Sequence, residues 1–402
     1  MSSVARDEQT LQRRAAALAD DAVLARVVTD ARPALHAQRW RREFMRFDPA
    51  ARCFALVSLA SIAPPGVALR IAAYRDESCA AAEEAAPRWH GDLGWVVVSD
   101  CGADPELPGL APILAQAPLA RVLRYRPLRR CTVYVPDAGG GARVVKVFAD
   151  GRGASLDADA RELWRAARDG ALGFEVAQPD RYDPATSSVW QHVIDGRPLE
   201  DALCGPGGVA LAAAMGRALA TLTKADVEPS QRFTGRDQMA RTARYANELV
   251  ARLPDQAAAV AGMMTSLEAI HARAALRPLR PIHGAPHAHQ WLDCGRCLAL
   301  VDFDRFCRGD PELDAATFIA EMDFEDAVRV PIARINAAFL RGYMNVAGPL
   351  DEALLQAYRC HKRIAKALKH ARALHGDRKR KASRHLRFAQ QCLEAIGEGM
   401  RQ

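Results

Sequence analysis

The first 120 residues alternate between short apolar runs and polar or turn residues. Runs rich in Val, Leu and Ala, separated by turn residues such as Pro-Pro-Gly, are typical of β-strands. Other stretches place apolar residues at helical spacing. The predicted strands are Cys53–Ser61, Val67–Tyr74 and Trp95–Val98, and the predicted helices are Gln9–Arg26, Asp30–Phe44 and Glu77–Ala86. We therefore expect residues 1–120 to form a mixed α/β section.

The next 80 residues predict a small sheet followed by a helix. Strands are expected at Arg121–Tyr125, Cys131–Val135 and Arg143–Phe148, with a helix at Asp157–Arg168. Another strand-like run, Val189–Val193, precedes a change of pattern. Residues 121–200 are accordingly interpreted as one small lobe.

From residue 201 onward the pattern is helical. Leu211, Met215, Leu219 and Leu222 recur at three- and four-residue spacing, as on one helix face. Further helices are predicted at Arg241–Leu253, Ala257–Ala275, Ala315–Met322, Pro331–Met344, Leu350–His375 and Ala382–Gly397. We expect residues 201–402 to form a larger helical lobe.

One stretch of this lobe, 283–314, breaks the helical pattern. Two short apolar runs, Trp291–Leu292 and Leu298–Val301, surround the turn residues Asp293–Arg296, which predicts a β-hairpin. Polar residues gather at both ends of this hairpin: His283, His287, His289 and Gln290 before it, and Asp302, Asp304, Asp310 and Asp314 after it. A rigid hairpin that holds such groups is a typical support for a functional site.

This stretch resembles the catalytic core of the aminoglycoside phosphotransferase and choline kinase family, which is related to the protein kinases. The family carries H-G-D-x-H-x-x-N, a hairpin, I-D-[FW] and G-D-P-x-x-D. His283, Gly284 and His287 match the first motif, Asp302-Phe303 the second, and Gly309-Asp310-Pro311 with Asp314 the third. The resemblance implies an α+β, bilobal, protein-kinase-like fold with a small antiparallel-sheet lobe, a larger helical lobe and an N-terminal α/β extension.

Two positions depart from the family motif. Ala285 stands where the family has its catalytic aspartate, and Gln290 stands where it has an asparagine. The resemblance implies that Asp302 and Gln290 bind Mg²⁺, because hard oxygen ligands suit this ion. Alanine accepts no proton, so His287 or His289 would have to act as the base. The resemblance also places His283 among the candidate catalytic residues, with His287 and His289.

The resemblance also implies a nucleotide site in the small lobe. Lys146, on the third predicted strand, would hold ATP phosphates and pair with Glu162 on the following helix. The loop 126–130 replaces the usual glycine-rich loop, and its Arg126 and Arg129 could contact phosphate directly. The adenine would meet backbone groups of Gln191, His192 and Val193.

Two other interpretations concern the same stretch. The three histidines with Asp302 could bind zinc, with thiolates added from Cys294 and Cys297, although a single C-x-x-C is weak evidence. Asp310 and Asp314 are expected to hold the backbone of the following segment and its helix start.

Composition and charge limit the classes of protein. Of the 402 residues, 50% are hydrophobic and 26% charged, which favours a large core over disorder. No apolar run reaches about 18 residues, so no transmembrane helix is expected. The N-terminus lacks the apolar segment of a secretory signal. Ten scattered cysteines fit reduced thiols, and a cytoplasmic location is expected.

Basic residues concentrate at the C-terminus. From Arg359 to the end there are 13 Lys/Arg and 3 Asp/Glu, whereas the whole chain has a net charge of +7. The run Arg378–Arg387 could attract nucleic acid or an anionic membrane surface, but it has no interleaved aromatic residues, and a solvated helix face explains it more simply. The sequence argues against a nucleic-acid partner.

Three functions remain for the chain. The first is a phosphotransferase that uses Mg²⁺ and ATP to phosphorylate a hydroxyl of an unknown small molecule or peptide. The second function, which Ala285 favours, is that of an inactive pseudokinase that acts on a protein partner. The third is an adaptor for nucleic acid or a membrane surface through the basic C-terminal segment.

Overall fold

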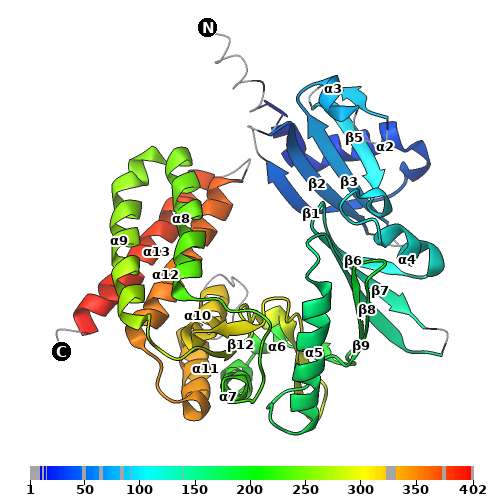
Figure 1. The fold of residues 1–402 in the computed structure, drawn as a ribbon. Coiled ribbons are helices and arrows are strands. Elements are labelled where there is room, and N and C mark those ends of the chain that lie inside the picture. Colours follow the sequence, from blue (N-terminus) through cyan, green and yellow to red (C-terminus); the bar gives the residue numbers. More distant parts are fainter. Residues whose placement is uncertain are drawn as a thin grey trace. The chain divides into compact units, whose positions relative to one another are not determined.

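A computed structural model describes residues 16–322, 332–373 and 377–399, apart from 48–50, 63–66, 82–85, 92 and 138; residues 10, 13 and 14 are also described. The chain divides into two compact units (Figure 1). The first comprises Met1–Asp157 and Pro179–Val193, and the second comprises Ala158–Gln178 and Ile194–Gln402. The predicted helix beginning at Pro331 and the end of the helix predicted at Glu77–Ala86 fall partly outside the described residues.

The first unit opens with an antiparallel sheet in the order β1-β2-β3-β5-β4. Its strands are β1 (Trp40–Phe47), β2 (Cys53–Ser61), β3 (Ala68–Tyr74), β4 (Arg88–His90) and β5 (Gly94–Asp100). Every residue of β3 is buried, because the strand is central and both faces of the sheet are covered. Helices α2 (Asp21–Ala31) and α3 (Glu77–Ala80) accompany this sheet.

The helix predicted over Asp30–Phe44 is wrong. Helix α2 ends at Ala31, a 3₁₀ turn covers Pro33–Leu35, and β1 begins at Trp40. Arg32, the residue before Pro33, has φ −137° and ψ 73°, since the proline ring disfavours helical backbone in the residue before it. Pairing of β1 with β2 then outweighs the helical spacing of the side chains.

A second antiparallel sheet of the same unit has the order β6-β7-β8-β10-β9. Its strands are β6 (Arg121–Arg126), β7 (Arg130–Pro136), β8 (Ala142–Phe148), β9 (Pro179–Asp183) and β10 (Ser188–His192). Alternate residues of β7 are buried, among them Cys131 and Val133, and they pack with Ile113 of α4 (Leu110–Gln116). Helix α5 (Gly153–Arg168) follows β8.

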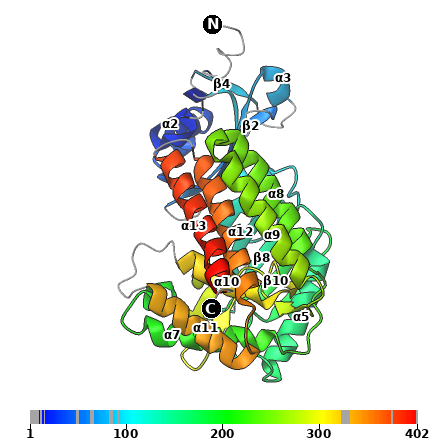
Figure 2. The ribbon, with the colours of Figure 1, turned by 90° about the vertical axis from the view of Figure 1, so that its left-hand side faces the viewer.

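The second unit is mainly helical. Its helices are α6 (Glu200–Leu203), α7 (Gly208–Leu222), α8 (Gly235–Arg252), α9 (Ala257–Ala274), α10 (Pro311–Met322), α11 (Ile332–Ala347), α12 (Glu352–Ala371) and α13 (Arg378–Gly399). Figure 2 shows α8, α9, α12 and α13 side by side, and their apolar faces form one core cluster, which includes Leu249, Leu267 and Ile364. No helix in the described part of the chain is long and apolar enough to cross a membrane.

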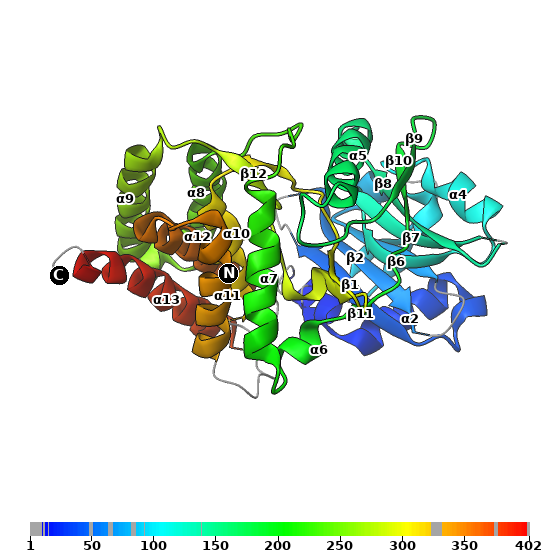
Figure 3. The same ribbon diagram turned by 90° about the horizontal axis from the view of Figure 1, so that it is seen from below.

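Helices α7 and α11 pack unusually closely (Figure 3). A Cβ atom on Gly216 would approach the Phe339 carbonyl oxygen to less than 3.0 Å, and one on Gly342 would do the same to the Ala213 carbonyl oxygen. Two glycines therefore let the backbones touch. This contact belongs to the core that surrounds the fully buried Trp291.

Short strands join the helices. They are β11 (Arg197–Pro198), β12 (Arg280–Ile282), β13 (Trp291–Asp293), β14 (Leu298–Leu300) and β15 (Cys307–Gly309). The predicted hairpin is confirmed, because β13 pairs antiparallel with β14 around the turn at Cys294–Cys297. Strand β12 pairs with β15, so the segments just before His283 and just before Asp310 lie beside each other.

Candidate active site

The loop that follows β12 is held by a buried carboxylate. Asp314, on the first turn of α10, accepts hydrogen bonds from the backbone N–H groups of His283 and Gly284, both at 2.8 Å. Burial raises the pKa of Asp314 to about 7, and the two N–H donors oppose this rise. Asp314 thus fixes a loop 30 residues earlier in the chain, rather than the helix start that the sequence suggested.

His283 positions the backbone of the base position. Its side chain is fully buried, and its ring lies 4.5 Å from that of Phe303. Nε2 donates to the Val301 carbonyl oxygen at 3.2 Å, which leaves Nδ1 to accept from the Ala285 N–H at 3.4 Å. Since both ring nitrogens have partners within the protein, this geometry gives His283 a positioning role.

Gly284 is required by its backbone. It has φ +78°, a conformation that favours glycine, and a Cβ atom there would come closer than 3.0 Å to the Arg305 carbonyl oxygen. The chain after β14 therefore contacts this loop directly before Ala285.

The two predicted metal ligands are neighbours. The Gln290 Nε2 donates to Asp302 Oδ2 at 3.1 Å, while Gln290 Oε1 accepts from the His287 N–H at 2.6 Å. The backbone donor of His287 fixes which way the amide points, so Gln290 orients Asp302. Asp302 has φ +70°, a strained conformation for a residue with a side chain and one that recurs at functional sites.

No basic side chain occupies the base position itself. Ala285 is only 7% exposed and its methyl group accepts no proton. His287 and His289 stack at 5.3 Å, and Nδ1 of His287 lies 3.8 Å from Glu321 Oε1. Burial lowers the pKa of His287 to about 4, although Glu321 acts in the opposite direction. His287 is therefore neutral near pH 7 and is a weak base.

The zinc interpretation finds no support in this geometry. Within the described residues, no group of three or more His, Cys, Asp or Glu side chains could hold a metal ion. Cys297 instead donates to the Glu175 carboxylate at 3.0 Å, and this hydrogen bond raises the pKa of its thiol to about 11. A thiol that stays protonated is a poor zinc ligand.

The predicted phosphate-binding lysine lies in the middle of the second sheet. Lys146 of β8 pairs in register with Thr132 of β7 and with Val189 of β10. Alternation along β8 directs its side chain away from the face that buries Val145 and Val147.

Glu162 belongs to the other unit and has a partner there. Its Oε1 accepts from the Glu228 N–H at 2.8 Å. One turn earlier on α5, Asp159 accepts from the N–H of Ser230 at 2.8 Å and from its hydroxyl at 2.7 Å. This face of α5 thus holds the connection between α7 and α8, and pairing of Glu162 with Lys146 stays a prediction.

The basic loop after β6 is a tight turn. The Arg129 N–H donates to the Arg126 carbonyl oxygen at 3.1 Å, and Leu128 has φ +61°. Asp104 anchors it by accepting from the Leu128 N–H at 2.8 Å and from the Tyr125 hydroxyl at 2.6 Å. A buried acid and a strained leucine replace glycine in shaping this turn.

The predicted adenine-binding segment ends β10. Gln191 and His192 pair with Val144 and Arg143 of β8, and the Val193 N–H donates to the Ala142 carbonyl oxygen at 3.1 Å. The first unit ends at Val193. The Val193 donor is thus already used in the sheet.

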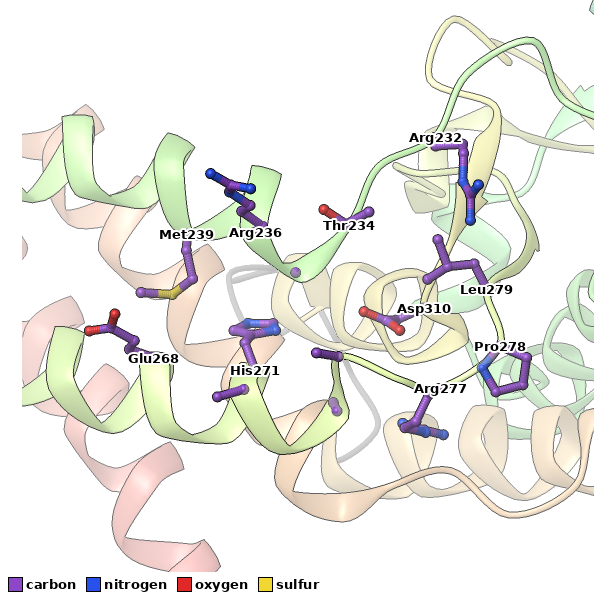
Figure 4. A pocket seen from close by; sticks show the side chains of 14 residues that line it. Arg232, Thr234, Arg236, Met239, Glu268, His271, Arg277, Pro278, Leu279 and Asp310 are labelled. Carbon is purple, nitrogen blue, oxygen red and sulfur yellow. The ribbon is translucent and has the colours of Figure 1, made fainter.

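A separate cavity of about 590 Å³ lies within the helical unit. The start of α8, the end of α9 and Asp310 surround it; Figure 4 shows Arg236 and Glu268 toward one end and Arg232 toward the other. Neither Ala285 nor Asp302 lines it. Asp310 accepts from the Tyr358 hydroxyl at 2.5 Å and so ties this wall to α12.

His271, on the wall of this cavity, belongs to a buried hydrogen-bond chain. Its Nε2 lies 2.9 Å from Nε2 of His361, and Nδ1 of His361 lies 2.8 Å from the Thr242 hydroxyl. Burial lowers the pKa of His271 to about 4 and lowers that of His361 well below its ordinary value. This chain of hydrogen bonds therefore joins α8, α9 and α12 through neutral imidazole rings.

We expect this pair to make the helical unit unstable in acid. His271 binds a proton below about pH 6.5 in the unfolded state but only near pH 4 in the folded state. The free energy of unfolding therefore has its full value above pH 6.5 and decreases as the pH falls toward 4. The loss for His271 is on the order of 3 kcal/mol. Denaturant unfolding followed by circular dichroism at pH 7.5 and 4.5 measures it. His271→Gln should lose less stability in acid than the wild type, whereas the exposed His289→Gln should follow the wild type; equal losses in all three proteins would contradict this assignment.

The comparison with protein families identifies the class of this protein. A model described as "Phosphotransferase enzyme family" matches residues 129–358, more than half of the chain. The chain belongs to this family, and its α+β kinase-like fold is confirmed. No curated protein sequence matches it.

Solved structures resemble the chain at low sequence identity. APH(2")-IIia in complex with GDP and kanamycin has a TM-score of 0.50 and 15% identity, over 71% of this chain and 99% of that one. A choline/ethanolamine kinase family protein from Mesorhizobium loti has a TM-score of 0.48 and 19% identity, over 66% and 85%. Choline kinase LicA from Streptococcus pneumoniae has 0.48 and 13%, over 68% and 93%. At these identities the similarity concerns the fold.

Proposed function

We propose that the protein is a phosphotransferase that binds Mg²⁺ and ATP and transfers the γ-phosphoryl group to a hydroxyl of a small molecule or peptide. The observation that carries this proposal is the joined pair Gln290–Asp302, beside a loop that Asp314 fixes at both His283 and Gly284. Phosphoryl transfer depends mainly on the positioning of the reactants and on charge neutralisation. A loop fixed by hydrogen bonds, with an oriented carboxylate beside it, can position the reactants.

The donor set fits a magnesium ion. Asp302 offers a hard carboxylate oxygen, and Gln290 Oε1 keeps one lone pair beyond the one that accepts from His287. Mg²⁺ bound there would neutralise the charge on the phosphates. Lys146 would hold phosphates of the nucleotide, supported by Glu162, while Arg126 and Arg129 would contact them from the turn after β6. The structural neighbour with a TM-score of 0.50 was solved with GDP, which supports a nucleotide ligand.

The proposed step is a direct displacement. The acceptor hydroxyl oxygen forms a bond to the γ-phosphorus, the bond from this phosphorus to the leaving oxygen of ADP breaks, and the hydroxyl proton is released. His287, neutral near pH 7, and His289 are the side chains proposed to take this proton. Neither histidine stands at the family's base position, which Ala285 occupies, so turnover is expected to be slow.

The buried Ala285 favours a second function. A protein of this family that lacks its base can serve as a nucleotide-binding pseudokinase that acts on a protein partner. Binding of nucleotide without turnover, for any acceptor, distinguishes this function from catalysis. The adaptor function has less support, because α13 uses Ala382, Leu386 and Ala389 to pack in the helical core and leaves only one basic face outward.

Calorimetry of ATP and Mg²⁺ binding tests the proposal. We expect Mg²⁺-dependent binding to the wild type and binding at least tenfold weaker in Asp302→Ala and in Lys146→Ala, since each lost charged contact is worth about 1.5–3 kcal/mol. Asp293→Ala is the matched control, because it removes a carboxylate that lies in the hairpin turn. Within the described part of the chain, this carboxylate accepts a hydrogen bond from a backbone N–H of the same turn.

Each outcome of this titration has a meaning. Weak binding in both site variants together with normal binding in Asp293→Ala supports a working nucleotide site. Absence of binding by the wild type at millimolar ATP would contradict both the enzyme and the nucleotide-binding pseudokinase.

A further inference from the structure

The cavity of about 590 Å³ in the helical unit is lined by two buried polar side chains, His271 and Asp310, which are 7% and 5% exposed. One atom of each is fixed within the protein: His271 Nε2 lies 2.9 Å from His361 Nε2, and Asp310 Oδ2 accepts from the Tyr358 hydroxyl at 2.5 Å. Within the described part of the chain, the other two atoms, His271 Nδ1 and Asp310 Oδ1, have no hydrogen-bond partner. Neither atom is fully enclosed by protein, so both face the cavity.

The hydrogen-bond chain behind His271 makes its Nδ1 a donor. The Thr242 hydroxyl accepts from Gln238 Nε2 at 3.0 Å, and among the described residues its own proton has one acceptor, His361 Nδ1 at 2.8 Å. Because a buried hydroxyl proton is rarely left without an acceptor, His361 carries its proton on Nε2 and donates it to His271. The neutral His271 ring therefore has its proton on Nδ1, the atom that faces the cavity.

This donor lies at the N-terminus of α8. A Cβ atom on Gly235, the first residue of α8, would come closer than 3.0 Å to His271 Nδ1, so the ring lies directly against the helix start. A capping box between Thr234 and Asp237 already uses two backbone N–H groups. The N–H groups of Gly235 and Arg236 have no acceptor inside the helix. An imidazole N–H beside a long helix's N-terminus is a favourable place for an anionic group.

The charges around the cavity are balanced. Arg277 donates at 2.9 Å to Glu312, whose carboxylate is fully buried, so this cation is already neutralised. The other charged residues of the wall are two arginines and two acids: Arg232, Arg236, Glu268 and Asp310. Figure 4 shows His271 and Asp310 at separate points of the wall. A ligand with charges of one sign would meet a like charge, whereas a ligand with one charge of each sign matches this wall.

We propose that this cavity is a second binding site, which takes a small zwitterion of the amino-acid type. Its carboxylate would accept hydrogen bonds from His271 Nδ1–H and from the first N–H groups of α8, with Arg236 as the nearby cation. Its ammonium group would donate to Asp310 Oδ1. Met239 and Leu279, on the same wall, provide apolar surface for the side chain of the ligand.

The size and place of the cavity suit such a ligand. Its volume of about 590 Å³ lies in the range of small-molecule sites, about 300–1,000 Å³. Neither Ala285 nor Asp302 lines it, so the zwitterion is a ligand in addition to the nucleotide and the phosphoryl acceptor. Binding here is therefore independent of the proposed phosphotransferase function.

Ligand binding to the full chain tests the inference. Thermal unfolding with each standard amino acid at millimolar concentration identifies the best ligand, and calorimetry measures its affinity. The same titration is made with the corresponding deaminated acid and with the corresponding decarboxylated amine. We expect the amino acid to bind at least tenfold more tightly than either, because each of these lacks one charged hydrogen-bonding group. Absence of binding by every amino acid, or equal affinity for the acid or the amine, would overturn the inference.

Two variants test the two halves of the site. Asp310→Asn should abolish the preference for the amino acid over the deaminated acid, since the ammonium group loses its carboxylate. Arg236→Met should weaken binding of the amino acid and of the acid but not of the amine. A change that only loosened the cavity would weaken all three ligands.

Arg244→Met is the matched control. Arg244 is exposed, lies about two turns further along α8 and is not on the wall of the cavity, so binding should equal that of the wild type. Arg236→Met, an exposed change, keeps the test decisive if Asp310→Asn does not fold. Unchanged ligand preferences in the cavity variants, or an equal loss of binding in Arg244→Met, would contradict the site.

Nitrogen-15 NMR of the histidine rings checks the donor directly. The His271 signals are assigned by their loss in His271→Gln. We expect the proton on Nδ1 in the free protein and a shift of this resonance when the amino acid binds. A proton on Nε2 of His271, or an Nδ1 resonance that stays unchanged at saturation, would contradict the proposed contact with the carboxylate.

Discussion

Replacing Ala285 with aspartate is expected to raise phosphoryl-transfer turnover by about 10²- to 10⁴-fold, the usual contribution of a positioned general base. The substitution places a carboxylate at the family's base position, on a loop whose backbone Asp314 and His283 already hold. His287 is expected to supply less, because it lies two residues away from the family's base position and its Nδ1 lies 3.8 Å from Glu321 Oε1. The rate of ADP release with Mg·ATP and an excess of each member of a panel of hydroxylated acceptors, aminoglycosides included, measures the effect.

Ala285→Asn is the control for this gain. Asparagine has nearly the shape of aspartate but accepts no proton at neutral pH, so its turnover should stay at the wild-type level. An equal rise in both variants would show that the added polar volume, rather than a base, matters. If Ala285→Asp binds Mg·ATP normally and still turns over no acceptor, the pseudokinase function is the better description.

Local chemistry explains why parts of the fold and site could be predicted. The hairpin of β13 and β14 was predicted from two apolar runs around a turn, because both strands and the turn are contiguous. The family motifs from His283 to Asp314 are equally local, and they predicted that Gln290 and Asp302 would be neighbours. The strands β2, β7 and β8 follow from alternation and branched residues.

Features that depend on distant partners could not be predicted. Nothing near Asp314 in the sequence indicates that its carboxylate binds N–H groups of His283 and Gly284. Strand β1 was interpreted as a helix because its pairing with β2 leaves no signal in its own spacing.

The sequence also could not orient the Gln290 amide. A glutamine at position 290 suggested a metal ligand. In the structure the His287 N–H donates a hydrogen bond to the Gln290 amide oxygen, so the amide nitrogen points toward Asp302. The strained backbone of Asp302 likewise has no sequence signal. Both properties come from the three-dimensional loop rather than from residue type.

Replacing Gly284 with alanine is expected to be among the most damaging single changes in the helical unit. The position combines φ +78° with a Cβ that would approach the Arg305 carbonyl oxygen to less than 3.0 Å. Left-handed backbone alone costs a non-glycine residue about 1–2 kcal/mol. The clash adds to this cost, because a backbone atom can move only if the segment from Asp302 to Arg305 moves with it.

Gly295→Ala isolates the backbone part of this effect. Gly295 has φ +82° in the turn between β13 and β14, and a Cβ atom there would meet nothing within 4 Å. Denaturant unfolding should therefore show a loss of about 1–2 kcal/mol for Gly295→Ala and at least twice that loss for Gly284→Ala. Since movement of Asp302 disturbs the proposed metal ligand, Gly284→Ala should also weaken Mg²⁺-dependent ATP binding, while Gly295→Ala should leave it intact. Equal losses of stability in the two variants would show that the loop and the Arg305 segment are not in contact.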